Sequence, residues 1–342
     1  MHRHSLFVRL FAGLLLLAAV RASAAETAWP VPDWQTASPD SQQMSSDGLT
    51  KVRDWLEQHG SKTGLVVRHG QIVGEWYFGD ATAKSKYIVY STTKSFASTA
   101  AAMAIYDGKL TLDTKVGSVL AEAAPSPKGD VTLRQVISMT TGVHNDTKIH
   151  MDPERFTHAL TTEPMDFAPG TKWDYNNTGL SLLSPLIRKA TGRDIDQWLA
   201  ERVFAPIGIQ AEDWSWERAE DYPLPYSGLH INARALARFG LLFLNDGKWQ
   251  DRQVVPAEWV KEATGPSQDL NKSYGYLWWN NTTGKWKGVP ADAYAALGRF
   301  DNDMLIVPSL DLIVIRQIGD DPEPKRKLQI GELFALAVEA AK

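Results

Sequence analysis

The sequence predicts an α/β (α+β) fold: an antiparallel sheet flanked by helices, built from both chain ends, with a mainly helical inserted domain. Strand patterns separated by turns occur near both ends of the 342-residue chain, at residues 64–78 and 276–318. Residues 111–260 have mainly helical spacing, broken by loops that contain Gly and Pro. Because strands from both ends can share one sheet, we expect an α/β domain from residues 46–110 and 261–342, with residues 111–260 inserted.

The first predicted elements are a helix and a hairpin. Residues 49–59 have helical spacing, with their large apolar residues on one side. Residues 64–68 and 71–78 are apolar runs joined by two residues, the second of which is Gly. This pattern is typical of two antiparallel strands joined by a tight turn.

A long helix is predicted over residues 91–106, which are rich in Ala and are followed by Asp107-Gly108, a pattern typical of a helix C-terminus. The helices expected within the insertion are residues 133–139, 180–190, 195–204 and 233–244. The strands expected afterwards are residues 276–279, 293–297, 304–307 and 312–318, and a helix over 328–341 closes the chain. A catalytic cleft is expected between the two parts of the molecule.

The first 24 residues have the pattern of a signal peptide. A basic start is followed by the apolar residues 10–20 and by Ala22-Ser23-Ala24, small residues that suit a signal peptidase. The apolar run is shorter than the roughly 20 residues that span a bilayer, so no membrane anchor is expected. We therefore expect cleavage near residue 24 and a periplasmic or secreted protein.

Composition excludes several classes of function. The formal net charge of -4 argues against a nucleic-acid partner, which favours a basic excess. The absence of cysteine removes thiol catalysis, zinc–thiolate sites and disulfides. His144, His150 and His158 do not form a His-Glu-x-x-His pattern, and no phosphate-binding Gly-rich loop occurs. We expect neither a metal nor a cofactor.

Ser91 and Lys94 form the central motif, Ser-x-x-Lys, at the start of the predicted long helix. Side chains three apart on a helix share a face, so the two can meet. A serine hydroxyl becomes a good nucleophile when a base takes its proton, and a desolvated lysine can be neutral and act as that base. An N-cap serine followed by a surface lysine is the structural alternative.

Tyr175 and Asn177 form a second motif, Tyr-x-Asn, in a loop before a predicted helix. A phenol can pass a proton when a cation lies near it, and an amide side chain can bind Lys94 or a substrate amide. Packing for Tyr175 and helix capping for Asn177 are the structural alternatives.

Together these motifs resemble those of the serine β-lactamase and penicillin-binding-protein family. The Tyr-x-Asn form is similar to the class C β-lactamase branch, which includes family VIII esterases, D-amino-acid peptidases and 6-aminohexanoate-dimer hydrolases. The resemblance extends to Ser227-Gly228-Leu229, to residues 275–279 and to residues 307–311. It implies Ser91 as nucleophile and Lys94 and Tyr175 as the proton-handling pair.

The third family motif, Lys-Thr-Gly or a variant, departs from the pattern here. Its counterpart is Ala296-Leu297-Gly298, which keeps the glycine and lacks the cation that meets a substrate carboxylate. By resemblance, the backbone N–H groups of Ser91 and Arg299 form the oxyanion hole. The missing cation weakens the expectation of β-lactam hydrolysis more than it weakens the assignment of Ser91 as the nucleophile.

We therefore predict a cofactor-free serine hydrolase that cleaves a small ester, amide or peptide bond through an acyl-enzyme on Ser91. Asn177, Gly298 and Arg299 are the expected substrate-binding and oxyanion residues. Two alternatives stay open at this point: a catalytically silent, penicillin-binding-like ligand-binding module, and a true β-lactamase or D-amino-acid peptidase.

Overall fold

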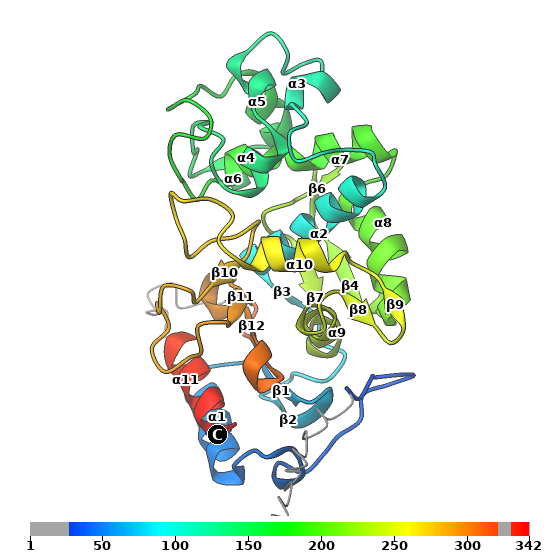
Figure 1. Ribbon diagram of the computed structural model, residues 1–342, viewed down its shortest axis with the longest axis vertical. Helices are drawn as coiled ribbons and strands as arrows, with labels where there is room; N and C mark the ends of the chain where they lie inside the picture. The colour runs from blue at the N-terminus through cyan, green and yellow to red at the C-terminus, as the bar shows by residue number, and fades with distance from the viewer. Residues whose placement is uncertain (1–26, 321–329, 342) are drawn as a thin grey trace, which may run out of the picture.

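The computed structural model describes residues 27–320 and 330–341 (Figure 1). The expected signal peptide, residues 1–24, lies outside the described residues. None of the described helices has the length and apolar character needed to span a bilayer.

A six-stranded antiparallel sheet joins the two ends of the chain. Its strand order is β10-β11-β12-β13-β1-β2. The N-terminal strand β1 pairs with the C-terminal strand β13 at the centre, with Val66 opposite Val314. The strands are β1 (Thr63–Arg68), β2 (Gln71–Tyr77), β10 (Trp279–Asn280), β11 (Tyr294–Ala296), β12 (Asp303–Val307) and β13 (Leu312–Gln317). The predicted fold class is confirmed.

Helices cover both faces of this sheet, which explains why β1, β12 and β13 are buried at every position. Helices α1 (Ser46–Gln58) and α11 (Ile330–Ala340) pack side by side on one face. Helices α2 (Thr93–Tyr106) and α9 (Ala233–Leu244) lie on the other. Strands buried on both faces read as continuous apolar runs, as the sequence shows.

The remaining elements lie mainly between residues 111 and 265 and occupy the upper and middle parts of Figure 1. The helices there are α3 (Val116–Val119), α4 (Leu133–Ile137), α5 (Arg155–Thr161), α6 (Asn177–Ser181), α7 (Leu183–Thr191), α8 (Ile195–Leu199) and α10 (Ala257–Thr264). The short strands are β3 (Tyr87–Ile88), β4 (Trp214–Trp216), β5 (Arg218–Ala219), β6 (Tyr222–Pro223), β7 (Leu229–Ile231), β8 (Lys248–Trp249) and β9 (Arg252–Gln253). The division into domains at residues 110 and 260 stays a prediction.

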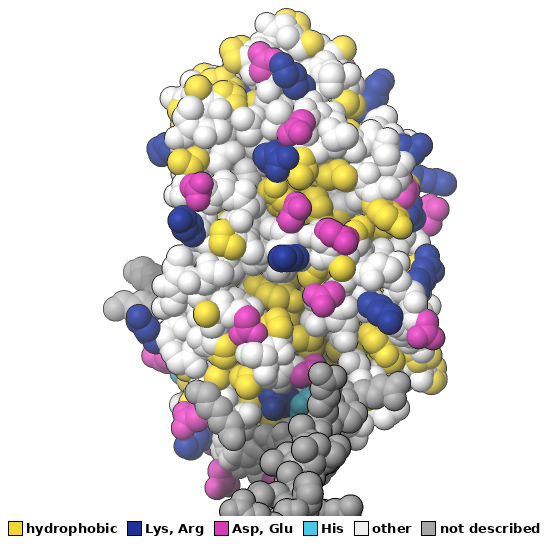
Figure 2. Space-filling view, viewed as in Figure 1, with side chains coloured by type: hydrophobic (Ala, Val, Ile, Leu, Met, Phe, Trp, Pro, Cys, Tyr) yellow, Lys and Arg dark blue, Asp and Glu magenta, His cyan; other side chains and the backbone are white. Residues whose placement is uncertain are grey.

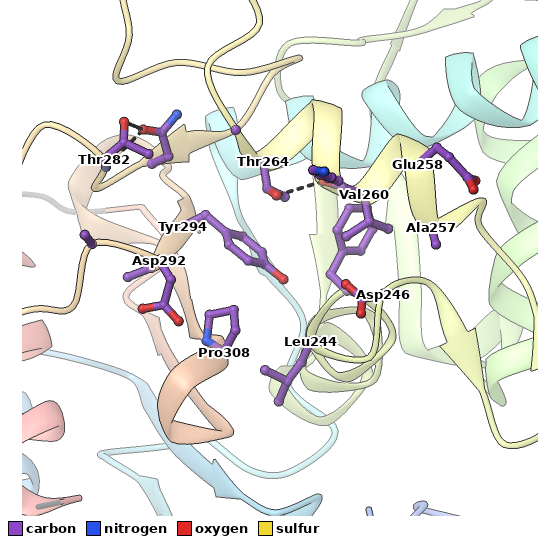
Figure 3. Close-up of a pocket in the computed structure, with 16 residues that line it drawn as sticks. Leu244, Asp246, Ala257, Glu258, Val260, Thr264, Thr282, Asp292, Tyr294 and Pro308 are labelled. Carbon is purple, nitrogen blue, oxygen red and sulfur yellow. Dashed lines mark hydrogen bonds between the residues drawn. The ribbon is translucent and has the colours of Figure 1, made fainter.

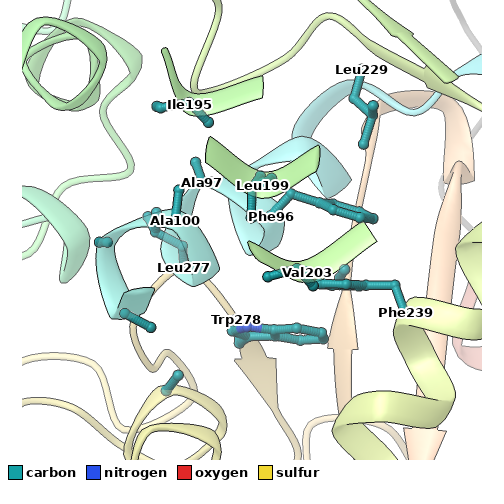
Figure 4. Close-up of a cluster of buried hydrophobic side chains, with 14 of the residues drawn as sticks. Phe96, Ala97, Ala100, Ile195, Leu199, Val203, Leu229, Phe239, Leu277 and Trp278 are labelled. Carbon is teal, nitrogen blue, oxygen red and sulfur yellow. The ribbon is translucent and has the colours of Figure 1, made fainter. Parts of the chain in front are cut away.

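Most of one expected strand is a turn in the structure, and only its last residue, Trp279, belongs to a strand. Residues 276–279 were expected to be extended, but Leu277 has a positive φ of 63° and the N–H of Gly275 bonds the carbonyl of Trp278 at 2.8 Å. The turn buries Trp278 completely, in the apolar cluster beside Phe239 (Figure 4). Burial of the indole therefore outweighs the extended preference of the apolar run.

Helix α2 is held in the core by aromatic stacking. Phe96 is fully buried, and its ring lies 3.9 Å from that of Phe239 on α9, centroid to centroid. We expect Phe96→Ala to lower the free energy of unfolding by about 3–5 kcal/mol, since it leaves a cavity at this contact. Urea denaturation measures the change.

The matched control is Tyr106→Ala, at the exposed end of the same helix, where 68% of the side chain is accessible. It should change stability by no more than about 0.5 kcal/mol. Equal effects of the two substitutions would contradict the assignment of this contact to the core.

Candidate active site

Ser91 lies in a constrained turn between β3 and α2. The turn Tyr90–Thr92 is a 3₁₀ segment, so the long helix begins two residues later than the sequence predicted. Tyr90 has a positive φ of 46°, a conformation that costs energy for a residue with a side chain. The Thr92 hydroxyl donates to the carbonyl of Asn302 at 2.7 Å. These contacts fix the backbone on both sides of the serine.

Lys94 forms a direct hydrogen bond with Ser91. Its Nζ donates to Ser91 Oγ at 2.9 Å and to the backbone carbonyl of Tyr226 at 2.8 Å. The side chain is 1% exposed, and within residues 27–320 and 330–341 no carboxylate lies within ion-pair distance of it. Burial lowers the pKa of Lys94 well below its usual range because a charged amine is poorly solvated there.

Tyr175 completes the contact around the amine. The Lys94 Nζ lies 4.8 Å from the centroid of its ring, and the ring stacks on Trp279 at 5.9 Å. Burial raises the pKa of Tyr175 to about 12, although its hydrogen bond with Ser91 acts in the opposite direction. The phenol is therefore protonated near neutral pH and is suited to donate a proton.

The two asparagines after Tyr175 have different structural roles. Asn176 caps α6: its Oδ1 accepts from the N–H of Gly179 at 2.7 Å, and its Nδ2 donates to the carbonyl of Val143 at 2.6 Å. Asn177 Oδ1 is buried and has no hydrogen-bond partner among the described residues. Since buried polar atoms are nearly always paired, Asn177 has an acceptor available for a ligand.

Gly298 brings the end of β11 against the turn that carries Ser91. A Cβ at position 298 would lie only 2.2 Å from the carbonyl oxygen of Val89, so this close approach requires glycine. Arg299 follows directly and lines the same cavity as Ser91. Ala296 is 1% exposed and belongs to the core, and it supplies no charge to the site.

The cavity beside Ser91 has a volume of about 580 Å³. Asn177, Tyr226 and Arg299 are among the residues that line it. Lys94 and Tyr175 lie behind Ser91 and do not line the cavity. The predicted site residues are thus brought together from α2, the start of α6 and the end of β11.

Sequence reasoning missed two contributors to this site. Tyr226 bonds Lys94 through its backbone carbonyl, which leaves no side-chain signal beyond its position next to Ser227-Gly228-Leu229. Arg155 lines the cavity, but nothing in its local sequence distinguishes it from a surface arginine.

A larger cavity of about 650 Å³ lies between α9, α10 and the edge of the sheet. Apolar side chains gather on this face, with charged groups among them (Figure 2). Leu244, Asp246 and Tyr294 face the cavity (Figure 3). It is lined by no serine and by none of the predicted site residues, so the smaller cavity is the candidate active site.

Two of the three histidines considered for a metal site bond to different carboxylates. His144 Nδ1 lies 3.1 Å from Asp166, and His158 Nδ1 lies 2.7 Å from Asp152. In the part of the chain that the structure describes, no group of three or more His, Cys, Asp or Glu could hold a metal ion.

Two solved structures share this fold. A family VIII carboxylesterase superposes with a TM-score of 0.70 and 18% identity, covering 87% of this chain and 99% of that chain. A penicillin-binding protein homologue from Caulobacter crescentus superposes with a TM-score of 0.67 and 19% identity, covering 87% and 99% of the two chains.

Curated relatives cover most of the chain. Penicillin-binding protein 4 of Amycolatopsis lactamdurans is 26% identical over 276 residues, which are 68% of this chain and 71% of that protein. The 6-aminohexanoate-dimer hydrolase of Paenarthrobacter ureafaciens is 21% identical over 308 residues, or 81% and 76% of the two chains.

The model of the Beta-lactamase family matches residues 56–327. That range contains the Ser-x-x-Lys turn, the Tyr-x-Asn loop, and β11 with the Gly298 that follows it. The predicted family resemblance is confirmed: the chain belongs to the Beta-lactamase family of serine hydrolases.

Proposed function

We propose that this protein hydrolyses a small ester or amide through an acyl-enzyme formed on Ser91. One observation carries the proposal: a buried lysine amine with a lowered pKa lies 2.9 Å from a serine hydroxyl that lines an open cavity. A neutral amine in this position can take the serine proton. No cofactor is needed for this chemistry.

In the first half-reaction, Ser91 Oγ attacks the substrate carbonyl carbon and its proton passes to Lys94. The backbone N–H groups of Ser91 and Arg299 stabilise the oxyanion. The protonated phenol of Tyr175 donates a proton to the leaving group. A water molecule then attacks the Ser91 ester and gives a proton to the Tyr175 phenolate. Lys94 returns its proton to Ser91 Oγ as the acyl–oxygen bond breaks, and the acid product leaves.

Lys94 and Tyr175 are in contact, so their titrations are coupled. Apparent pKa values measured for the enzyme belong to the pair. The lowered pKa of the amine and the raised pKa of the phenol support Lys94 as proton acceptor and Tyr175 as donor in the acylation step.

Asn177 supports a substrate with an N–H group near the scissile bond, because its unpaired Oδ1 can accept that hydrogen bond. Among the similar proteins, one relative is named a 6-aminohexanoate-dimer hydrolase and one solved structure a family VIII carboxylesterase. Small esters, amides and peptides are therefore the proposed substrates. The pattern of residues 1–24 supports export to the periplasm or the medium as the proposed location.

A fluorophosphonate probe should label Ser91 alone, and Ser91→Ala should abolish both labelling and hydrolysis of p-nitrophenyl acetate. Peptide mass spectrometry identifies the labelled residue. Ser227→Ala, at a serine that lines the same cavity, should still be labelled. A silent ligand-binding module would show no turnover, and labelling at another serine would refute the nucleophile assignment.

Lys94 must be neutral to act, which determines the pH dependence. Burial lowers the pKa of Lys94, so kcat/KM should be retained above this lowered pKa and should decline as pH falls through it. The acid limb should therefore lie well below about 10.4, the usual lysine pKa. Lys94→Arg, which keeps a permanent charge, should lose about 10²–10⁴-fold in kcat at every pH. Recovery of its activity at alkaline pH would contradict the role of the neutral amine.

Tyr175→Phe removes the phenol and keeps the ring that stacks on Trp279. We expect kcat to fall by about 10²–10⁴-fold. The double variant with Lys94→Ala should lose less than the product of the two single losses, since residues that act as a unit are not additive. Full multiplicativity in steady-state kinetics would show that the two groups act independently.

A further inference from the structure

The cavity beside Ser91 has more basic than acidic side chains on its wall. His150, Arg155, Arg218 and Arg299 line it, and Glu217 is the acidic group among them. Ala296 gives the strand beside Ser91 no cation. Recognition of a charged group on the substrate therefore depends on these residues that line the cavity.

Two of these charged groups already have partners. Arg218 bonds the carboxylates of both Asp194 and Asp196, the latter at 2.6 Å. Glu217 Oε1 lies 3.0 Å from Nε2 of His230. Arg218 therefore offers no full free charge to a ligand, and the Glu217 carboxylate already has a hydrogen-bond partner.

Arg155 is held only by neutral acceptors. Its Nε donates to the carbonyl of Asp152 at 2.7 Å, and its Nη1 donates to the hydroxyl of Tyr226 at 3.3 Å. Among the described residues, no carboxylate lies within ion-pair distance of the guanidinium. Its Nη2 takes part in neither bond and is available, with the free N–H of Nη1, for a planar anion.

The carboxylates around the start of α5 are occupied by other groups. The Asp152 carboxylate binds Nδ1 of His158 at 2.7 Å and the N–H of Glu154 at 2.9 Å. The Glu220 carboxylate accepts from the N–H of Phe156 at 2.7 Å. Neither carboxylate forms an ion pair with Arg155 in the part of the chain that the structure describes, and Asp152 interacts with its charge only through space.

Tyr226 connects Arg155 to the reacting groups. The tyrosine is 1% exposed; its backbone carbonyl bonds Lys94, and its hydroxyl end bonds Arg155. The guanidinium therefore lies about one tyrosine side chain away from the catalytic amine, at the end of the cavity formed by α5. This offset suits a charge carried away from the scissile bond.

Arg299 is less suited to this task. Its side chain is exposed, and its guanidinium lies over the ring of Phe300 at 4.6 Å. Arg155 is half-buried and oriented by two hydrogen bonds. Its side chain therefore loses less conformational freedom than that of Arg299 when a ligand binds.

We propose that Arg155 binds a carboxylate carried by the substrate, separated from the bond that Ser91 attacks. This specificity rests on the proposed serine hydrolase function. The preferred substrates are esters or amides whose acyl or leaving part ends in a carboxylate. Arg155 acts on substrate selection and takes no part in the proton transfers.

The experiment compares matched charged and uncharged esters. Mono-4-nitrophenyl adipate and 4-nitrophenyl hexanoate differ by a carboxylate on the acyl part, and 3-acetoxybenzoate and phenyl acetate by one on the leaving part. Each pair is assayed with wild type, Arg155→Gln, Arg155→Lys and the control Arg193→Gln. Arg193 is an exposed arginine, 3.9 Å from Glu201, outside the cavity.

In at least one pair, Arg155→Gln should lower kcat/KM for the charged ester by about 10- to 100-fold. It should leave the uncharged ester within about twofold, and Arg155→Lys should restore part of the preference. Arg193→Gln should change neither. Equal losses for both esters of each pair, or an unchanged ratio, would overturn the proposal. Absence of Ser91-dependent turnover of all four esters would instead refute the proposed function.

Discussion

The burial of the Lys94 amine against Ser91 is the constraint on which the rest of the site depends. A charged amine without a counter-charge is unstable away from water, so the folded chain favours its neutral form. The Lys94 amine is shielded from solvent because α2 is packed on all sides, with every residue from Thr93 to Ala104 buried. Small side chains on this helix let Phe239 and the sheet approach closely. Core packing and nucleophile activation therefore have the same structural origin.

The turn that carries Ser91 is held by segments that are distant in sequence. Asn302 accepts from Thr92, the Thr93 hydroxyl accepts from the N–H of Leu229 at 3.2 Å, and Gly298 packs against Val89. A positive φ at Tyr90 persists because these contacts determine the local conformation. Pairing of β1 with β13 holds the two chain ends in one sheet and keeps these segments adjacent.

Reactivity and recognition come from different parts of the chain. The nucleophile and its amine lie at the start of α2, while the unpaired acceptor of Asn177 and the guanidinium of Arg155 come from α6 and α5. The side chains that line the cavity can therefore be replaced while the reacting groups keep their positions. Such an arrangement explains how one fold serves esters, amides and peptides by altering its side-chain contacts.

Local spacing was enough to predict the fold class and to bring Ser91 and Lys94 together, while the family resemblance implied the roles of Ser91, Lys94 and Tyr175. A separation of three residues at a helix start brings two side chains together whatever surrounds them, and apolar runs at both chain ends indicate a shared sheet. The family pattern added Gly298 and Arg299.

Only the tertiary structure decided which asparagine caps α6 and which has a free acceptor, because both lie in the same loop. It alone showed the carbonyl of Tyr226 bonding Lys94, since a backbone group has no sequence signature. It also showed that residues 276–278 leave the extended form to bury Trp278, so that β10 begins only at Trp279. The lack of a direct ion pair at Arg155 among the described residues depends on where Asp152 and Glu220 make their bonds. Such pairings arise from contacts between distant segments, and local sequence spacing carries no information about them.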